Sequence, residues 1–358
     1  MTKNENPLKS ILKQFGLDIE HAQIKQFTSG LINKTWKITM SDRSFILQKI
    51  NDHAFKNPKV IDQNLTHLKT YLNLHHPDYL FVAPLPTTDG QTLINSKDGY
   101  YRLFDFVKDS NTLKFVNTAE EAFEAARQFG KFTRLLSNFN TDDLAYTIPD
   151  FHNLNLRYSQ FIDACNNASP ERLGLAKEAI QFITENKSIA DTYNQIIANR
   201  SIPLRVIHHD TKISNVLFDQ HQKGICIIDL DTVMPGFYIS DVGDMMRTYL
   251  SAANEEETDF TLIKIRKDFF SSIFLGYLSE MNPVLSDDER QLFIYSGEFS
   301  IYMQAIRFLT DFLNNDVYYE AKYPGHNLNR AMNQITLLKE YVKARPDFRI
   351  MMSDVKLD

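Results

Sequence analysis

LRVIHHDTKISNVLFDQHQKGICIIDLD, residues 204–231, contains two short apolar runs, Asn215–Phe218 and Ile225–Ile228. Both runs are rich in residues that favour strands, and a segment of turn-forming residues, 220–224, lies between them. This pattern predicts a β-hairpin, with the polar loop HHDTKISN leading into its first strand.

The register of this hairpin predicts which side chains meet at its open end. If Asp219 faces Ile225, Asn215 lies directly opposite Asp229, and facing side chains are roughly 5 Å apart on one face. An amide oxygen and a carboxylate would then converge just downstream of Asp210. Hard oxygen donors of this kind suit Mg²⁺, which takes one or two protein oxygens and otherwise phosphate oxygens and water.

The polar loop also has the spacing H-x-D-x-K-x-x-N. In phosphoryl transfer to a hydroxyl, an Asp accepts the hydroxyl proton, an Asn five residues later holds a metal, and an Asp on the next hairpin holds the metal that bridges the phosphates. Asp210, Asn215 and Asp229 match these roles in order and spacing. Each alone is equally a turn former that bonds its own backbone, but all three between two strands favour phosphoryl transfer.

Three motifs carry a resemblance to a known family: H-x-D-x4-N, I-D-x-D and D-x-G-D. They resemble the aminoglycoside phosphotransferase and choline kinase superfamily. SIPLRV-x-H-x-DTK, IIDLDT-x-MPG, RFL-x-D-x-L and KYP-x-HNL-x-R are similar to the bacterial N-acetylhexosamine 1-kinases in particular. The resemblance implies an α+β, protein-kinase-like fold of two lobes. It also implies ATP as co-substrate, Mg²⁺, and phosphorylation of the anomeric hydroxyl of an amino sugar. Spacing alone supports only phosphoryl transfer.

Length and composition set the broad class. The chain has 358 residues, more than one ordinary core, so we expect two domains: a nucleotide-binding lobe over 1–107 and a catalytic and substrate-binding lobe over 108–358. A 43% apolar and 23% charged composition is typical of a globular protein. The net charge of −6 argues against a nucleic-acid partner, which favours a basic face.

Cysteine content and hydropathy point to the cytoplasm. Cys226 lies inside an apolar run and Cys165 is the only other cysteine, so a disulfide framework is excluded and a buried thiol is expected. MTKNENPLKS has no apolar signal-peptide region, and no run reaches the 18 or so apolar residues of a membrane helix. We expect a cytoplasmic monomer that binds a small sugar and ATP, with no nucleic-acid or membrane partner.

The first hundred residues predict a small sheet. Ile24–Phe27, Thr35–Met40 and Phe45–Ile50 have the composition of strands. The loop between the first two contains Gly30 and Asn33, which the resemblance implies are close to the nucleotide. One glycine is a weak sign of a phosphate lid, and a plain turn is the alternative.

The third predicted strand departs from the kinase pattern. Kinases carry a lysine on this strand that faces the phosphates and pairs with a helix glutamate. Gln48 stands at that place, and strand alternation points Lys49 to the other face. The helix predicted over residues 60–74 has no glutamate, so Asn64 is the expected partner of Gln48. Lys212 is then our candidate for the missing charge beside the transferred phosphoryl group, and a solvated loop lysine is the alternative.

The run YYRLFDFVKD, residues 100–109, is the second strand of another predicted hairpin and leaves the small lobe. The resemblance implies that this segment is the hinge whose backbone reads adenine, with Phe104 and Phe106 lining the apolar slot. Alternating aromatic residues are more often part of a core than of a cofactor pocket, so the adenine role rests on the resemblance alone.

From about residue 112 onward helices dominate: Thr118 and Glu121 have the spacing of a capping box, and residues 157–166 and 173–199 are further helical stretches. Several polar residues of this region are candidates for the acceptor site. Arg307 lies in an apolar helical stripe; it either holds a sugar hydroxyl or pairs with Asp311 one turn away. The resembling sugar kinases use the arginine of this motif for the sugar, and Tyr318 is carried over in the same way. His152 either lines the cleft or is a structural histidine.

Further carboxylates and a histidine surround the proposed metal pair. The resemblance implies that Asp241 supports the catalytic loop through its backbone, and His208 is expected to have a similar structural role. Asp231 either reaches a second Mg²⁺ or caps local amides. Asp244 adds acidity beside the metal, and an arginine is expected to hold one of these carboxylates.

Two alternative functions stay open. The acceptor could be an aminoglycoside, choline or another small alcohol, and an aminoglycoside would need many carboxylates around a polycation. The chain could also be a catalytically silent kinase-like binding module. Gln48 in place of the strand lysine is the best argument for the silent module, and intact Asp210, Asn215 and Asp229 argue against it.

Overall fold

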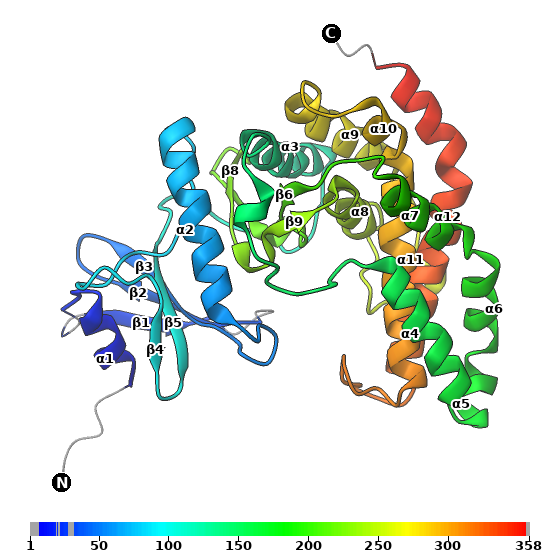
Figure 1. Ribbon diagram of the computed structural model, residues 1–358, viewed down its shortest axis with the longest axis horizontal. Helices are drawn as coiled ribbons and strands as arrows, with labels where there is room; N and C mark the ends of the chain where they lie inside the picture. The colour runs from blue at the N-terminus through cyan, green and yellow to red at the C-terminus, as the bar shows by residue number, and fades with distance from the viewer. Residues whose placement is uncertain (1–6, 19, 21, 28–31, 356–358) are drawn as a thin grey trace.

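The computed structural model describes residues 7–18, 20, 22–27 and 32–355, which form a small lobe with a sheet and a larger, mostly helical lobe (Figure 1). The small lobe contains a five-stranded antiparallel sheet in the order β1-β2-β3-β5-β4. Its strands are β1 (Gln23–Gln26), β2 (Lys34–Thr39), β3 (Ser44–Lys49), β4 (Ile94–Ser96) and β5 (Gly99–Asp105). The three strands expected before residue 51 are confirmed to within two residues.

The two faces of the sheet differ in chemistry. One face is apolar, and Leu47 and Leu103 pack there against Leu12 of α1 (Pro7–Gln14). On the other face the register aligns two rows across β2, β3 and β5: Thr35–Gln48–Arg102 and Lys37–Ile46–Phe104. Residues that face one another across antiparallel strands share a face, so this second face, which we call the cleft face, carries polar and charged side chains.

Helix α2 (Pro58–His75) connects the sheet to the large lobe (Figure 1). Its apolar side chains recur at helical spacing and pack into the larger core, namely Ile61, Leu65, Leu68 and Leu72. The Asn64 amide donates to the carbonyls of Ala145 (2.8 Å) and Val233 (3.2 Å). The expected Asn64–Gln48 hydrogen bond is therefore wrong, because Asn64 faces the large lobe.

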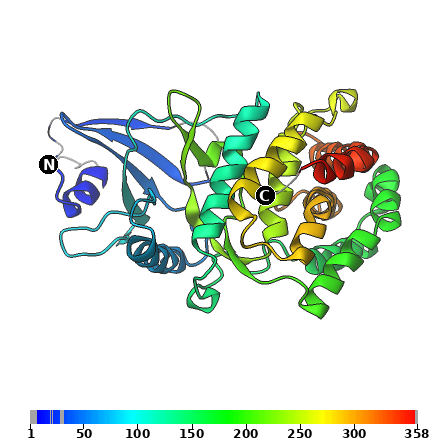
Figure 2. The same cartoon turned by 90° about the horizontal axis from the view of Figure 1, so that it is seen from above.

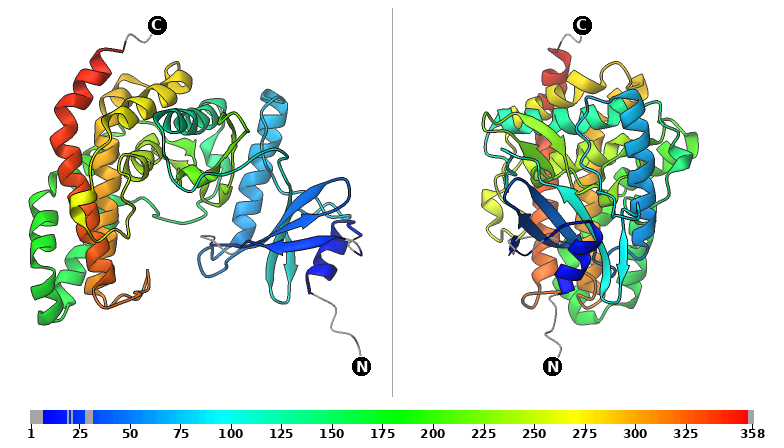
Figure 3. Two further views of the ribbon diagram at one scale, coloured as in Figure 1. Left: turned by 180° about the vertical axis from the view of Figure 1, so that it is seen from behind. Right: turned by 90° about the vertical axis from the view of Figure 1, so that its left-hand side faces the viewer.

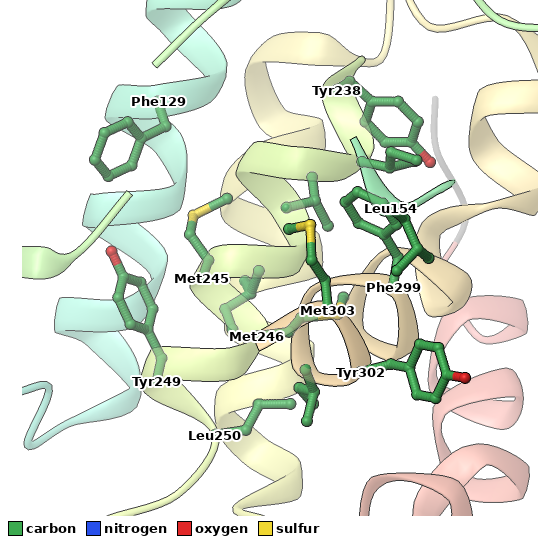
Figure 4. Close-up of a cluster of buried hydrophobic side chains, with 14 of the residues drawn as sticks. Phe129, Leu154, Tyr238, Met245, Met246, Tyr249, Leu250, Phe299, Tyr302 and Met303 are labelled. Atoms are coloured by element: carbon green, nitrogen blue, oxygen red, sulfur yellow. The ribbon is translucent and has the colours of Figure 1, made fainter. Parts of the chain in front are cut away.

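The large lobe is built around packed helices. They are α3 (Ala119–Leu135), α4 (Leu154–Asn167), α5 (Pro170–Leu175), α6 (Lys177–Glu185), α7 (Ser188–Asn199), α8 (Tyr238–Tyr249), α9 (Lys267–Met281), α10 (Asp287–Gln291), α11 (Phe293–Leu313) and α12 (His326–Ser353). Figure 2 shows α3 and α9 side by side, and in Figure 3 α12 lies at the opposite end of the molecule from α1. Figure 4 shows α8 in the middle of the core, with Met245 between Phe129 of α3 and Met303 of α11.

Two short two-stranded sheets lie at the surface of α3 and α8 that faces the small lobe. β6 (Arg205–Ile207) pairs with β9 (Met234–Gly236), and β7 (Val216–Phe218) pairs with β8 (Gly224–Ile227). The hairpin predicted from the central stretch is β7–β8. Three short 3₁₀ turns flank this region: Thr141–Asp143, Ile213–Asn215 and Leu230–Thr232; a fourth is Phe260–Leu262.

The observed helix boundaries agree with the sequence-based predictions at some positions and differ at others. The capping box predicted at Thr118 and Glu121 is confirmed as the start of α3. The stretch predicted to be helical over residues 173–199 is helical, but it is divided among α5, α6 and α7. α6 ends where the Asn186 side chain donates to the Phe182 carbonyl (2.9 Å), a local bond that competes with the next helical turn.

Two findings bear on cysteine chemistry and hydropathy. Cys165 and Cys226 are both free thiols, and Cys226 is buried, as expected. Among the described residues, no helix combines the length and the hydropathy that crossing a membrane requires.

Candidate active site

The loop of residues 208–215, which we call the catalytic loop, is fixed to α8 through its backbone. The fully buried Asp241 carboxylate accepts the His208 amide at Oδ2 (2.9 Å) and the His209 amide at Oδ1 (2.7 Å). Burial raises the pKa of Asp241 to about 7, while these two amide bonds act in the opposite direction. The carboxylate thereby fixes the two peptides that precede Asp210.

A second carboxylate of α8 supports the next residue of the loop. Asp244 Oδ2 accepts the Thr211 amide (2.9 Å), and the Tyr249 hydroxyl donates to the Thr211 carbonyl. Arg247 donates to Asp244 Oδ1 from Nε (3.1 Å) and Nη2 (2.9 Å). The expected arginine partner is therefore found, and Asp244 supports the loop through Thr211.

His208 ties the catalytic loop to the end of β8. Its Nε2 lies 2.9 Å from the Ile228 carbonyl, and its Nδ1 accepts the Asp210 amide (3.3 Å). This pattern requires the neutral ring with its proton on Nε2, and burial lowers the pKa of His208 in agreement. The ring holds Asp210 and the residue before Asp229 at a fixed separation.

The register expected for the β7–β8 hairpin is wrong by one residue. The Asn215 carbonyl accepts the Ile228 amide (2.8 Å), so Asn215 faces Ile228 rather than Asp229. The turn is tighter than expected, because the Asp219 amide donates to the Lys223 carbonyl (2.9 Å) rather than facing Ile225. A bulge then moves the register back by one residue: Leu217 pairs with Cys226 and Phe218 pairs with Gly224, which leaves Ile225 unpaired.

Asp229 nevertheless lies close to the other two candidate side chains. Its backbone is left-handed, with φ of 60°, a conformation that costs most non-glycine residues energy but that Asp adopts more readily. Burial, followed by the charges of Asp231 and Asp210, raises the pKa of Asp229 well above its usual value. The Asn215 Nδ2 donates to the Asp210 carbonyl (2.9 Å), which leaves the Asn215 side-chain oxygen for another partner.

The chemistry of these donors fits a divalent cation. Within the described residues, no group of three or more His, Cys, Asp or Glu side chains is arranged to hold a metal. Asn215 and Asp229 instead offer two hard oxygens, the number that Mg²⁺ takes from protein when phosphates and water complete its shell. The negative charges of Asp231 and Asp210 raise the pKa of Asp229, and a positive ion beside Asp229 would offset them.

Lys212 lies beside Asp210. Its Nζ is 3.4 Å from Asp210 Oδ1, and its side chain is 54% exposed. A flexible, solvated cation next to the candidate base can follow a charged group that enters or leaves the cleft.

Asp231 connects the two lobes. Its Oδ1 lies 2.5 Å from Nη2 of Arg102, and its Oδ2 accepts the Asn33 amide (2.8 Å). Asp231 therefore pairs with the small lobe rather than capping local amides, and its expected contact with a second Mg²⁺ stays a prediction. Arg102 also donates to Gln48 Oε1 from Nε (3.1 Å) and Nη2 (2.9 Å), so Gln48 holds an arginine where kinases place a lysine.

The remaining small-lobe candidates lie mainly on the cleft face. Phe104 lies 5.1 Å from the Arg102 guanidinium carbon, and the Phe106 ring lies 3.6 Å from Lys37 Nζ. Lys49 points to the opposite face, as expected, and pairs with Asp98 (3.4 Å). Gly30 lies outside the described residues.

A cavity of about 460 Å³ lies between α4 and α11, and Arg157, Arg307, Tyr318 and Tyr319 are among the residues that line it. This volume is within the usual range for small-molecule sites. Arg307 lies 5.5 Å from the ring of Tyr319. The alternative Arg307–Asp311 ion pair is wrong: Asp311 accepts the Tyr318 amide instead (2.7 Å), and across the described parts of the chain Arg307 has no salt bridge.

A row of rings leads from this cavity to the catalytic loop. Arg307 lies 5.5 Å from the Phe151 ring, Phe151 stacks on His152 at 4.4 Å, and His152 lies 5.3 Å from His209. Burial lowers the pKa of His152, so its ring is neutral. In the part of the chain that the structure covers, its buried Nδ1 has no hydrogen-bond partner. A second cavity of about 380 Å³ adjoins the ring of His152, so this residue lines a cleft.

Sequence reasoning missed three residues of this region: Arg102, Arg157 and Phe151. Arg102 lies in a strand rich in aromatic residues, and its partner Gln48 is 54 positions away, so no local pattern marks their contact. No local pattern in the sequence marks Arg157 or Phe151, because the cavity forms only when α4 packs against α11.

Comparison with known proteins agrees with this architecture. A spectinomycin phosphotransferase, solved with ADP and spectinomycin, is 13% identical with a TM-score of 0.59, over 96% of this chain and 99% of that chain. A microcompartment-associated aminopropanol kinase is 13% identical with a TM-score of 0.62, over 95% and 97%. A choline kinase from Cryptosporidium parvum is 14% identical with a TM-score of 0.53, over 94% and 95%. These likenesses confirm the expected two-lobed, kinase-like α+β fold. The model of the phosphotransferase enzyme family matches residues 23–262, more than half of the sequence, and the chain therefore belongs to that family.

Proposed function

We propose that this protein transfers the γ-phosphoryl group of ATP to a hydroxyl of a small neutral sugar, the anomeric hydroxyl of an N-acetylhexosamine. One observation supports the kinase part: buried carboxylates hold the amides of the loop that carries Asp210 and Asn215, and Asn215 pairs with Ile228, the residue before Asp229. Family membership supports the same reaction class, and the solved relative with ADP supports an adenine nucleotide as donor.

In the proposed reaction the acceptor hydroxyl attacks the γ-phosphorus, and Asp210 accepts its proton. The new O–P bond forms as the bond to the β-phosphate oxygen breaks, and ADP leaves. Asn215 and Asp229 would hold Mg²⁺, which when bound neutralises charge on the phosphates. Lys212, 3.4 Å from Asp210, offsets charge on the moving group. Positioning and electrostatics carry most of the rate, and the fixed backbone of the catalytic loop supports both.

The acceptor cavity supports a neutral sugar over a polycation. Arg157 and Arg307 both line it, and burial together with the charge of Arg307 lowers the pKa of Arg157. Two guanidinium groups that already repel each other disfavour an aminoglycoside or choline, whereas they suit hydroxyl and carbonyl oxygens. Tyr318 adds an exposed ring at the rim. The resemblance of the R-F-L motif at Arg307 to the bacterial N-acetylhexosamine 1-kinases supports an amino sugar.

The nucleotide is proposed to lie against the cleft face of the small lobe. Phe104 and Phe106 are half-buried there and would line the adenine slot. Asn33, whose side chain donates to Asp231, would lie next to the phosphates. Gly30 keeps its proposed place in the loop before β2. The lobe boundary is proposed at residue 107, just after β5 ends.

The test is an assay of ADP release with N-acetylhexosamines, aminoglycosides and choline as acceptors. We expect turnover with an N-acetylhexosamine and none with its 1-deoxy analogue, which lacks the anomeric hydroxyl. Turnover with choline or an aminoglycoside alone would overturn the sugar assignment and keep the kinase. Failure of every acceptor, with Mg·ATP still raising the melting temperature, would favour the silent binding module.

A further inference from the structure

The small lobe has no lysine at the strand position that kinases use, but an arginine, Arg102, supplies a positive charge beside that position. Gln48 occupies the lysine position, and α2 contains no glutamate to pair with a lysine. Arg102 stands next to Gln48 in the same row of the cleft face, one strand over on β5. Its side chain is 3% exposed, and an arginine tolerates such burial only when it is paired, here with Asp231.

The guanidinium is held in one orientation. Gln48 Oε1 accepts from two of its nitrogens, at 3.1 and 2.9 Å, and Asp231 Oδ1 lies 2.5 Å from Nη2. Gln48 is itself positioned by Thr35, whose hydroxyl accepts from Gln48 Nε2 (3.4 Å). A guanidinium has five N–H donors. No described residue accepts from Nη1 of Arg102 in the structure, so this nitrogen is available to another oxygen.

The position of Arg102 is next to the candidate metal pair. Its partner Asp231 follows Asp229 by two residues in the chain, and Asp231 Oδ1 lies 2.5 Å from the guanidinium, so Arg102 contacts the segment that carries Asp229. A phosphate chain bridged by a metal at Asp229 would therefore pass close to Arg102.

Stability alone is a poor reason for this arrangement. Removing two charges from water costs several kcal/mol each, and buried pairs are often replaceable by apolar residues without loss. Arginine is the side chain best suited to phosphate oxygens, because its planar fork gives two parallel hydrogen bonds. A phosphate ligand explains a buried, pre-oriented guanidinium whose Nη1 has no acceptor among the described residues.

We propose that Arg102, positioned by Gln48, binds the phosphate groups of the nucleotide in place of the missing strand lysine. This inference rests on the proposed kinase function and assigns its phosphate-binding group. In the absence of nucleotide Asp231 neutralises the guanidinium, and the phosphates share it once they bind.

The experiment is a calorimetric titration of the full chain with Mg·ATP, Mg·ADP and adenosine. Arg102→Gln should weaken Mg·ATP and Mg·ADP binding by about 10- to 100-fold, the usual value of a charge-assisted hydrogen bond, and leave adenosine binding unchanged. Lys49→Gln is the matched control: it removes a cation from the same sheet, on the opposite face, and should change none of the three affinities.

The double variant Gln48→Lys/Arg102→Gln separates charge from structure. It places a lysine where kinases have one, and it should recover most of the lost Mg·ATP affinity. Equal weakening of adenosine and Mg·ATP by Arg102→Gln, or no weakening of either, would overturn the proposal.

A folding defect in Arg102→Gln would be seen in its melting temperature. Gln48→Met then serves as the second variant, because it keeps Arg102 and its ion pair but removes the orienting carbonyl. It should weaken Mg·ATP several-fold and spare adenosine; unchanged Mg·ATP affinity would contradict the inference. Wild-type protein that binds no Mg·ATP at all would instead refute the proposed function.

Discussion

Replacing Asp241 by asparagine tests whether the catalytic loop is held by this one buried carboxylate. Asp241 accepts two backbone amides, from His208 and His209, at 2.9 and 2.7 Å. An asparagine has one oxygen, so one amide bond survives without charge assistance and the other amide faces an NH₂ group. Losing a charge-assisted bond costs about 1.5–3 kcal/mol, and leaving a buried N–H unpaired costs about 1–3 kcal/mol more.

We therefore expect Asp241→Asn to lower the free energy of unfolding by about 3–5 kcal/mol. Urea unfolding followed by circular dichroism measures this. Because the two amides precede Asp210, kcat for ADP release should also fall, while adenosine affinity changes little. Asp288→Asn, at an exposed carboxylate of α10, is the control and should stay within about 0.5 kcal/mol. An Asp241→Asn variant with wild-type stability and kcat would refute the reasoning.

Three further outcomes are expected. Asp210→Asn should lower kcat by about 10²–10⁴-fold, the usual share of a general base, with nucleotide affinity retained, and retained turnover would exclude Asp210 as the base. Arg307→Gln should raise KM for the sugar about tenfold or more and leave KM for ATP unchanged, because Arg307 lines only the acceptor cavity; an effect on ATP would contradict this. Burial lowers the pKa of His209 to about 3 from 6.5. The unfolded chain takes up this proton below pH 6.5 and the folded chain does not. The contribution of His209 to stability should therefore be full above pH 6.5 and fall by about 1.4 kcal/mol per pH unit below it. It is measured as the difference in unfolding free energy between wild type and His209→Gln, because the raised pKa of Asp241 changes stability in the opposite direction; a difference that stays constant from pH 7 to 5 would disagree.

Features formed by residues a few positions apart could be predicted, because the spacing of such residues in the sequence determines their contacts. The spacing of Asp210 and Asn215 placed both on one loop, and the structure joins them by a hydrogen bond of 2.9 Å. The capping box at Thr118 could be predicted because both of its residues lie within one helical turn. Strand alternation separated Gln48 from Lys49, since successive residues of a strand face opposite ways.

Contacts between segments far apart in the sequence could not be predicted from local patterns. The partner of Gln48 is fixed by the sheet order β3-β5, in which β5 adds beside β3 after the long α2 crossover. The register at Asn215 depended on a bulge at Ile225, and an extra residue in a strand leaves no mark in an alternating pattern. Asp231 was read as a metal or turn residue because its true partner, Arg102, belongs to the other lobe.

The central claim is that one divalent cation is shared by Asn215 and Asp229 beside Asp210. Its most direct measurement is the affinity for ATP with and without Mg²⁺, by calorimetry, in wild type, Asn215→Ala and Asp229→Ala. We predict that Mg²⁺ strengthens ATP binding to the wild type at least tenfold and that each substitution removes most of this gain. Variants that keep the full effect of Mg²⁺ would contradict the account.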